Sequence, residues 1–340
     1  MGRHGNIFGL VVINGFLLMF PLMVKSPFYQ DIFVMSFLIG YLGLCWNVTA
    51  ITGLFSLGHA AFVGIGGYTS SILFNQFNIS PWLGMFCGAA IAAIIACLIS
   101  LPSLRLRGIY FCLSTIACAN ALLAIVLVTQ KIGPFIIGGT EGVIIRILGD
   151  NPLYFQSRNK IFFYYVTYFL MLFGIVIYSK IRRSKLGFYL RAIGNEAEAA
   201  QSLGINLAKY KLISFMISGA LSAIAGTVLA QYTGFAEPNR LFGWEISFSI
   251  VVAVILGGGR YIPGPIIGGF IVTFISEMTR KYGGGSAVQG LNMIVYGLLL
   301  ILVVHFMGRG GICSLLERGR YKWKSSKSGT LPKGLGVSQP

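Results

Sequence analysis

The segment LGMFCGAAIAAIIACLISL, at residues 83–101, contains no charged residue and no proline. A helix needs about 20 mostly apolar residues to cross the hydrocarbon core of a bilayer, so this segment predicts a transmembrane helix. The whole chain has the same character, because 56% of its 340 residues are hydrophobic and only 10% are charged. Soluble domains carry about 25% charged residues. The composition therefore predicts an all-α integral membrane protein.

Nine further segments are apolar enough to enter a membrane, and three of them are shortened or interrupted by glycine and proline. The regular segments are 7–24, 32–52, 109–129, 161–179, 212–232 and 290–307, and the interrupted ones are 59–75, 242–256 and 263–278. The segment 242–256 would be about 22 Å long as a helix, which is shorter than the hydrocarbon core of about 30 Å. We expect it to be a half-helix or part of a re-entrant hairpin. The prediction is about 8–10 transmembrane helices, some of them broken or re-entrant.

The basic residues indicate an orientation. With the N-terminus inside, the inner segments carry 18 Lys and Arg and the outer segments carry 8. Cytoplasmic loops are enriched in Lys and Arg, so we expect a multi-pass membrane protein with both termini in the cytoplasm. The net charge of +17 is then a feature of topology. No nucleic-acid partner is expected.

Four regions describe the expected domain organisation. Residues 1–308 are predicted to form a transmembrane domain, and residues 309–340 a basic cytoplasmic tail. The tail is rich in Ser, Gly, Lys and Pro, which predicts disorder and an attraction to anionic membrane lipid. The outer loop 130–160 is too long for a simple turn, and loops of this length are commonly functional, with disorder as the alternative. The inner loop 180–211 is polar, basic and patterned as helix.

Two breaks in the apolar pattern are candidates for a transport pathway. The first is GLFSLGHAAF at residues 53–62, and the second is LGGGRYIPGP at residues 256–265. A broken helix exposes N–H groups that can hold a carboxylate and C=O groups that can hold an ammonium. Paired interruptions in the two halves of a chain point to a pathway, whereas the alternative is that the glycines only permit tight helix crossing. His59, in the first break, is either a packed, hydrogen-bonded residue or a functional one. The candidate pathway residues are Asn47, Ser56, Gly58, His59, Tyr68, Thr140, Glu141, Gly257, Gly258 and Gly264.

The inner loop contains the motif E-A-A-x-x-x-G at residues 198–204. An Ala-rich sequence with Glu near its start favours a short helix, and Gly204 can end it. A helix that is too polar to enter lipid suits docking into a groove on another protein. The alternative is an amphipathic loop helix without a partner.

Residues for ion coupling or catalysis are scarce. The chain has nine Asp and Glu, and two of them, Glu245 and Glu277, lie near the ends of interrupted segments. Their position suits snorkelling to the interface, which weakens an ion-coupled mechanism without eliminating it. No G-x-x-x-x-G-K-[S/T] phosphate loop, H-E-x-x-H or G-x-S-x-G motif occurs, and the six cysteines form no C-x-x-C pair. We therefore expect no enzyme activity, no bound metal and no cofactor in this chain.

Four blocks together resemble the permease subunits of branched-chain amino-acid ABC importers, the Liv-type M subunit in particular. They are Asn47 with GLFSLGHAAF and Gly66-Gly67-Tyr68, GGTEG at 138–142, the run from Leu186-Gly187 to Gly204-Ile205-Asn206, and LGG at 256–258 through Gly264-Pro265 to Gly268. They span about residues 50–270 in the family's order. The first and third blocks are specific, whereas the Gly-rich ones are weaker alone.

The resemblance implies a type II-like importer with two permease subunits, two ATPase subunits and a periplasmic binding protein. A related, shorter permease would complete a heterodimer, and the partner ATPase would use ATP and Mg²⁺. The family's loop continues toward an I-x-L-P ending, whereas this chain has KYKLIS at 209–214, which puts the docking geometry in doubt. The residues implied in coupling to the ATPase are Arg191, Glu196, Glu198, Ala199, Ala200 and Gly204.

The implied mechanism is alternating access. The binding protein would deliver an amino acid to the outer face, where loop 130–160 and Glu141 help to form the receiving surface. Branched-chain amino acids are the expected substrates, and a permease for urea or short amides is the alternative within the superfamily. A secondary amino-acid carrier driven by an ion gradient is the alternative from another class. An intramembrane enzyme would need converging polar catalytic residues, which the sequence does not show.

Overall fold

The computed structural model describes residues 14–24, 26–104, 106, 108–133, 135–149, 151–157, 159–282, 294–299, 301 and 305. A short apolar helix, Asn14–Met23, precedes α2. The helices that follow are α2 (Pro27–Ala50), α3 (His59–Phe77), α4 (Pro81–Ser103), α5 (Ile109–Val128), α6 (Lys160–Arg183), α7 (Lys185–Asn195), α8 (Ala197–Ser202), α9 (Leu207–Thr233), α10 (Pro238–Leu241), α11 (Trp244–Gly257) and α12 (Gly264–Tyr282). The strands are β1 (Lys131–Ile132), β2 (Phe135–Ile136), β3 (Val143–Ile144) and β4 (Phe235–Ala236), and the 3-10 turns are η1 (Gly139–Glu141) and η2 (Pro152–Tyr154).

The prediction of an all-helical membrane protein is confirmed. Six segments of the described chain are long and apolar enough to span a membrane: α2, α4, α5, α6, α9, and the unit Pro238–Gly257 that joins α10 to α11. This unit has 20 residues, so α10 supplies the length that the 14 residues of α11 lack. The expected spans 7–24 and 290–307 and the expected tail 309–340 lie partly or wholly outside the described residues.

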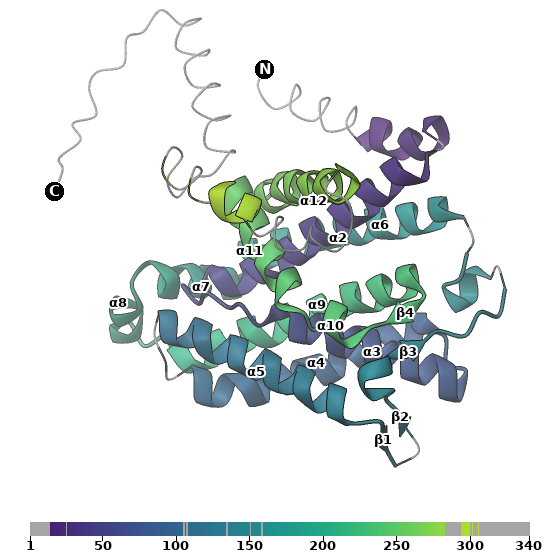
Figure 1. Ribbon diagram of the computed structural model, residues 1–340. Coiled ribbons are helices and arrows are strands. Elements are labelled where there is room, and N and C mark those ends of the chain that lie inside the picture. Colours follow the sequence, from purple (N-terminus) through teal and green to yellow (C-terminus); the bar gives the residue numbers. More distant parts are fainter. Residues whose placement is uncertain are drawn as a thin grey trace, which may run out of the picture.

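The long helices run roughly along one common direction (Figure 1). Helix α2 occupies the centre, because it packs against α6, α9, α11 and α12. Helix α3 packs mainly against α4 and α9, and its side chains are largely buried. These two central helices are covered by neighbours on several sides, whereas α5 presents most of its surface outward, as a helix that faces lipid does.

Helices α3 and α9 approach until their backbones touch. A Cβ atom at Gly66 would lie 1.9 Å from the Ala223 carbonyl oxygen, and a Cβ atom at Gly226 would lie 1.9 Å from the Val63 carbonyl oxygen. The Thr227 hydroxyl donates to the Gly66 carbonyl at 3.0 Å, which adds a hydrogen bond across the crossing. Small residues at helix crossings replace the missing hydrophobic driving force with close van der Waals contact. At this crossing, glycines allow the backbones of α3 and α9 to come into contact.

The two ends of the bundle differ in structure. Figure 1 shows α7 and α8 at one end, and β1, β2, β3 and β4 at the other. We call the first the α8 end and the second the loop end. At the loop end, β1 pairs with β2 and β3 pairs with β4, both antiparallel. The pairing of β3 with β4 ties the long loop to the segment that follows α9.

The loop 130–160 is attached to the helices over most of its described length. Asn75, near the end of α3, donates through its amide to the Ile144 carbonyl at 2.7 Å and accepts from the Arg146 N–H at 3.0 Å. Trp82, at the start of α4, donates to the Pro152 carbonyl at 3.0 Å and packs against the buried ring of Phe155. The loop therefore forms a cap over the ends of α3 and α4.

Candidate functional site

The predicted helix at the E-A-A-x-x-x-G motif is present as α8, which begins at Ala197 and ends at Ser202. It ends through two hydrogen bonds, from the Gly204 N–H to the Gln201 carbonyl at 2.9 Å and from the Ile205 N–H to the Ala200 carbonyl at 3.1 Å. Gly204 has φ +84°, a left-handed conformation that favours glycine. This bond pair is the Schellman arrangement of a helix C-terminus, so the prediction that Gly204 ends the helix is confirmed.

Helix α7 fastens this region to the bundle. The Arg191 guanidinium donates to the Arg182 carbonyl at 2.7 Å, at the end of α6, where the last carbonyls lack helical partners. Leu190 and Ile193 are buried. Gly194 lies against the link between α2 and α3, because a Cβ atom there would be 1.9 Å from the Ile51 carbonyl oxygen. A displacement of α7 would therefore reach Ile51 and Gly53 directly.

The opposite side of α7 and α8 is exposed. Glu196, which separates the two helices with extended φ and ψ of −153° and 103°, is exposed, as are Glu198 and Ala199. Two large apolar side chains are also exposed here, Phe188 at 64% and Leu203 at 82%. Polar residues around exposed apolar ones are typical of a protein docking surface.

His59 forms the centre of a buried hydrogen-bond network. The Ser218 hydroxyl donates its proton to the Cys45 carbonyl at 2.7 Å, so its oxygen accepts from His59 Nε2, also at 2.7 Å. With the proton on Nε2, Nδ1 accepts from the Ser56 hydroxyl at 3.2 Å. Both ring nitrogens are therefore satisfied within the protein, as a packed structural histidine requires.

The backbone donors of the first break are also occupied. The Ala60 N–H, in the first turn of α3, donates to the Ser247 hydroxyl of α11 at 2.8 Å. The Leu57 N–H donates to the Thr115 hydroxyl at 3.2 Å, and the Gly58 N–H donates to the Ser56 hydroxyl at 3.3 Å. In this conformation these three N–H groups are not available to a carboxylate ligand.

The structure ties the second predicted break to α2. Asn47, buried in α2, donates to the Gly259 carbonyl at 2.6 Å and to the Tyr178 hydroxyl at 2.9 Å. The second break is itself compact, because a Cβ atom at Gly257 would lie 1.7 Å from the Gly264 carbonyl oxygen. Gly258 has φ +93°. Close backbone approach, the alternative use of these glycines, is therefore realised at the second break.

The remaining candidate pathway residues lie elsewhere. Thr140 and Glu141 form part of η1 and are exposed at the loop end. Tyr68 is buried in α3, and its ring packs against Phe242 with ring centroids 5.7 Å apart. Its hydroxyl has no hydrogen-bond partner among the described residues.

A cavity of about 640 Å³ lies between α2, α5, α9, α10, α11 and α12. It reaches from the loop end, where α11 begins and α12 ends, to Leu42 and Ala225, well inside α2 and α9. We call it the charged cavity. Its apolar wall includes Met35, Leu38, Leu42, Leu123 and Leu229, and its polar lining includes Glu237, Arg240, Glu245, Glu277 and Arg280.

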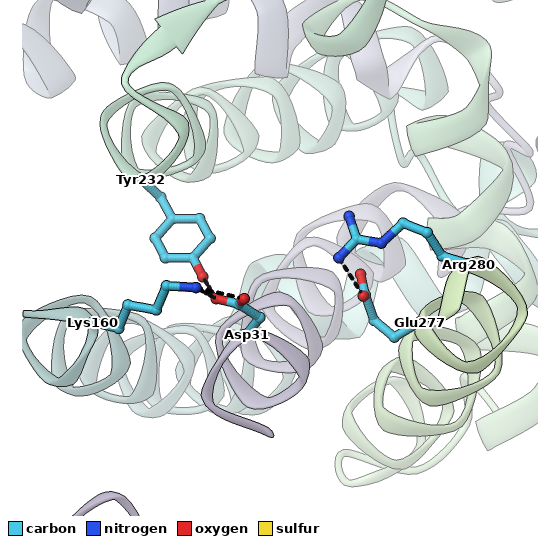
Figure 2. Close-up of polar contacts among 5 residues, drawn as sticks. All are labelled: Asp31, Lys160, Tyr232, Glu277 and Arg280. Atoms are coloured by element: carbon cyan, nitrogen blue, oxygen red, sulfur yellow. Dashed lines mark hydrogen bonds and ion pairs between the residues drawn. The ribbon is translucent and has the colours of Figure 1, made fainter. Parts of the chain in front are cut away.

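Some of the charges at this end are paired. Figure 2 shows Asp31 of α2 between Lys160 of α6 and Tyr232 of α9, with the Lys160 ammonium 2.6 and 2.7 Å from the two carboxylate oxygens and the Tyr232 hydroxyl also donating to Asp31. On α12, Arg280 donates to Glu277 at 2.6 Å. Asp31 and Lys160 line a neighbouring cavity of about 380 Å³, which shares Glu277 and Arg280 with the charged cavity.

Three other charges at the cavity have no partner among the described residues. The side chains of Glu237, Arg240 and Glu245 make no hydrogen bond or ion pair with any residue that the structure describes. The same described residues contain no group of three or more His, Cys, Asp or Glu that could hold a metal ion.

The family model for the branched-chain amino acid transport system permease component matches residues 28–304. The chain belongs to this family. The permease is 26% identical over 317 residues to the high-affinity branched-chain amino acid transport system permease protein LivM of Salmonella typhimurium, covering 88% of the chain and 72% of that relative. It is 26% identical over 299 residues to LivM of Escherichia coli K12, covering 82% and 69%.

A second group of relatives carries the other permease name of this system. The permease is 29% identical over 277 residues to the probable branched-chain amino acid transport permease protein LivH of Methanocaldococcus jannaschii, covering 80% of the chain and 85% of that relative. No solved structure matches the permease. The family membership and the six spans make it a multi-pass transport subunit of the membrane.

Sequence reasoning about the permease missed the charged cavity. The sequence places Glu245 and Glu277 near segment ends, and no pattern in it singles out Arg240. Glu277 is instead 9% exposed and paired with Arg280, so its carboxylate does not extend to the membrane interface as an unpaired charge. The available clue was that these charges all fall at ends of segments that one topology places on the same side of the membrane.

Proposed function

We propose that the permease is the membrane subunit of an ATP-driven importer of branched-chain amino acids in the bacterial inner membrane. A separate ATPase binds and hydrolyses ATP with Mg²⁺, and this chain binds no cofactor. A second, related permease completes the membrane part, and a periplasmic protein delivers the substrate. The names of the relatives support the substrate class, and the positive-inside bias of the sequence supports a cytoplasmic α8 end.

The observation that carries this proposal is the construction of α7 and α8. One side of the pair is fixed to α6 and to the link at Ile51, and the other side is exposed with Phe188 and Leu203 at its surface. An ATPase that moves this surface displaces the link between α2 and α3. Because Ser56 lies in this link, the displacement also reaches the hydrogen-bond network around His59. That is the path by which ATP hydrolysis drives alternating access.

Uptake by the reconstituted complex tests the proposal. Glu198→Lys reverses a charge that is favourable at the first turn of α8, and Gly204→Val forces a β-branched residue into a left-handed conformation. We expect the double variant to insert normally but to lose ATP-driven leucine uptake at least about tenfold, because interface charges and strain of this kind act on the order of 1–3 kcal/mol. The matched control is Lys131→Gln at the loop end, which should import at the wild-type rate.

Three results would contradict the proposal. Wild-type uptake by a well-expressed double variant would remove α8 from coupling. Uptake that follows a proton or sodium gradient without an ATPase would indicate a secondary carrier. Import of urea or a short amide in preference to leucine would replace the substrate class.

A further inference from the structure

The charged cavity is lined by charges of both signs that have no partners in the part of the chain that the structure describes. Arg240 on α10, Glu245 at the start of α11 and Glu237 just before α10 line it, and none of their side chains has an ionic or hydrogen-bonding partner in the described chain. Arg240 is exposed, and Glu237 and Glu245 are half-buried. Charges of both signs therefore line one cavity without partners among the described residues, which is an arrangement that a ligand with two opposite charges can use.

The paired charges nearby show that this end of the bundle can neutralise its own residues. Asp31 is held by Lys160 and Tyr232, which connects α2, α6 and α9 (Figure 2). Glu277 is held by Arg280 on the same helix. These groups already have partners, whereas Arg240 and Glu245 have none among the residues that the structure describes.

The cavity also has an apolar side. Leu38, Leu42 and Leu229 are each less than 10% exposed. Together with Met35 and Leu123 they form an apolar surface in the same cavity as the charged residues. A volume of about 640 Å³ lies within the range of about 300–1,000 Å³ that is typical of small-molecule sites. A ligand with a charged head and an aliphatic tail matches this arrangement.

We propose that the charged cavity holds the transported amino acid as its zwitterion. The Arg240 guanidinium binds the α-carboxylate, and the Glu245 carboxylate binds the α-ammonium. The branched aliphatic side chain enters the apolar wall between Leu38, Leu42 and Leu229. This assignment rests on the proposed function and specifies where the permease itself contacts its substrate.

The combination of charges selects the zwitterion over its halves. A guanidinium and a carboxylate make charge-assisted hydrogen bonds that can be bidentate. An aliphatic amine would leave Arg240 unpaired, and an aliphatic acid would leave Glu245 unpaired. Ser249, one helical turn after Glu245, also lines the cavity.

Photo-crosslinking tests this site directly. The complex of the permease with its partner permease and ATPase, without the binding protein, is placed in lipid nanodiscs and irradiated with L-photo-leucine, a leucine analogue that carries a diazirine. We expect labelled peptides from α2 and α9, including residues 35–42 and Leu229. Excess L-leucine should abolish the labelling, whereas 3-methylbutylamine and 4-methylpentanoate at the same concentration should not.

Variants assign the two charges. Arg240→Gln and Glu245→Gln should each reduce labelling about tenfold, because each removes a charge-assisted hydrogen bond to the ligand. Arg240→Lys should retain part of the labelling, since it keeps the positive charge but not the planar fork. Lys131→Gln removes an exposed cation that does not line the cavity and should label as the wild type does. Co-purification with the ATPase verifies that each variant is folded.

The outcomes separate this inference from the proposed function. If the wild-type complex with its binding protein imports leucine while Arg240→Gln and Glu245→Gln label and import normally, the zwitterion site is wrong and the importer stands. Labelling confined to helices other than α2 and α9 would also contradict the proposed site. Competition by 3-methylbutylamine or 4-methylpentanoate that equals the competition by L-leucine would contradict it as well. If the wild type imports no amino acid, the proposed function fails whatever the labelling shows.

Discussion

The region around His59 and the charged cavity use polar groups in opposite ways. Around His59, both ring nitrogens and the N–H groups of Leu57, Gly58 and Ala60 have partners within the protein. In the charged cavity, Arg240 and Glu245 line open space without partners among the described residues. Buried polar groups that are satisfied specify one structure, whereas unpaired charges that face a cavity remain available for binding.

The charged cavity also differs in its use of space from the second break and the crossing of α3 with α9, which we call the close-packed region. In the close-packed region, glycines bring backbones into contact and leave no room for a side chain. The charged cavity is lined instead by long side chains on six helices. Substitutions in the close-packed region should therefore lower folding stability, whereas substitutions in the cavity should weaken ligand binding. The following predictions test this difference.

The largest effect is expected at the crossing of α3 and α9. Gly226→Val places a branched side chain where a Cβ atom would already lie 1.9 Å from the Val63 carbonyl oxygen, so the helices have to separate. We expect loss of most monodisperse protein in mild detergent, measured by fluorescence-detected gel filtration. Gly15→Val, at a glycine where an added Cβ atom would meet no other atom within 4 Å, is the matched control and should behave as the wild type does. Equal yields of the two variants would contradict the tight crossing.

The next effect is expected at His59. His59→Ala leaves the Ser56 and Ser218 hydroxyls without a shared partner and opens a void, which together should cost about 2–4 kcal/mol of folding stability. The apparent melting temperature, measured by intrinsic fluorescence, should fall by several degrees, and Ser56→Ala should lower it less. If His59→Ala instead melts as the wild type does but loses uptake, His59 is a functional residue rather than a structural one.

A smaller effect is expected at Asn47, for which Asn120 is a matched comparison. Asn47→Ala removes the hydrogen bonds to Gly259 and Tyr178 from a buried site and should cost about 1–3 kcal/mol. Asn120→Ala removes the same side chain from an exposed position on the charged cavity and should leave the melting temperature unchanged. Equal melting temperatures for the two variants would show that the link between α2 and the second break does not stabilise the fold.

The smallest effect is expected at the ion pair of Asp31 and Lys160. Their side chains are 23% and 41% exposed, so water screens the pair and its net contribution should be about 1 kcal/mol or less. Lys160→Met should lower the melting temperature slightly, and the difference from wild type should shrink at high salt. A decrease in melting temperature comparable with that of His59→Ala would mean that this ion pair stabilises the fold as strongly as the hydrogen-bonded groups around His59 do.

Much of the fold and part of the candidate site could be predicted from local sequence. The spans at α4, α5, α6 and α9 follow from uninterrupted apolar runs, and the end of α8 follows from Gly204 after an Ala-rich stretch. The break at His59 was predicted as the start of a helix and is one. Its alternative roles, structural or functional, could not be separated, because the partners Ser218 and Ser247 lie far along the chain.

The amino-acid sequence alone defines the uninterrupted membrane spans, the family and the short helix α8, because apolar runs, caps and motifs are local features that act over a few turns. Only the tertiary structure places Arg240 of α10, Glu245 of α11 and the leucines of α2 and α9 around one cavity. Only the tertiary structure also shows that Asp31 and Glu277 have partners whereas Arg240 and Glu245 have none among the described residues. The reason is that pairing and cavity formation depend on how helices distant in sequence pack against one another, and single-helix patterns do not contain that information.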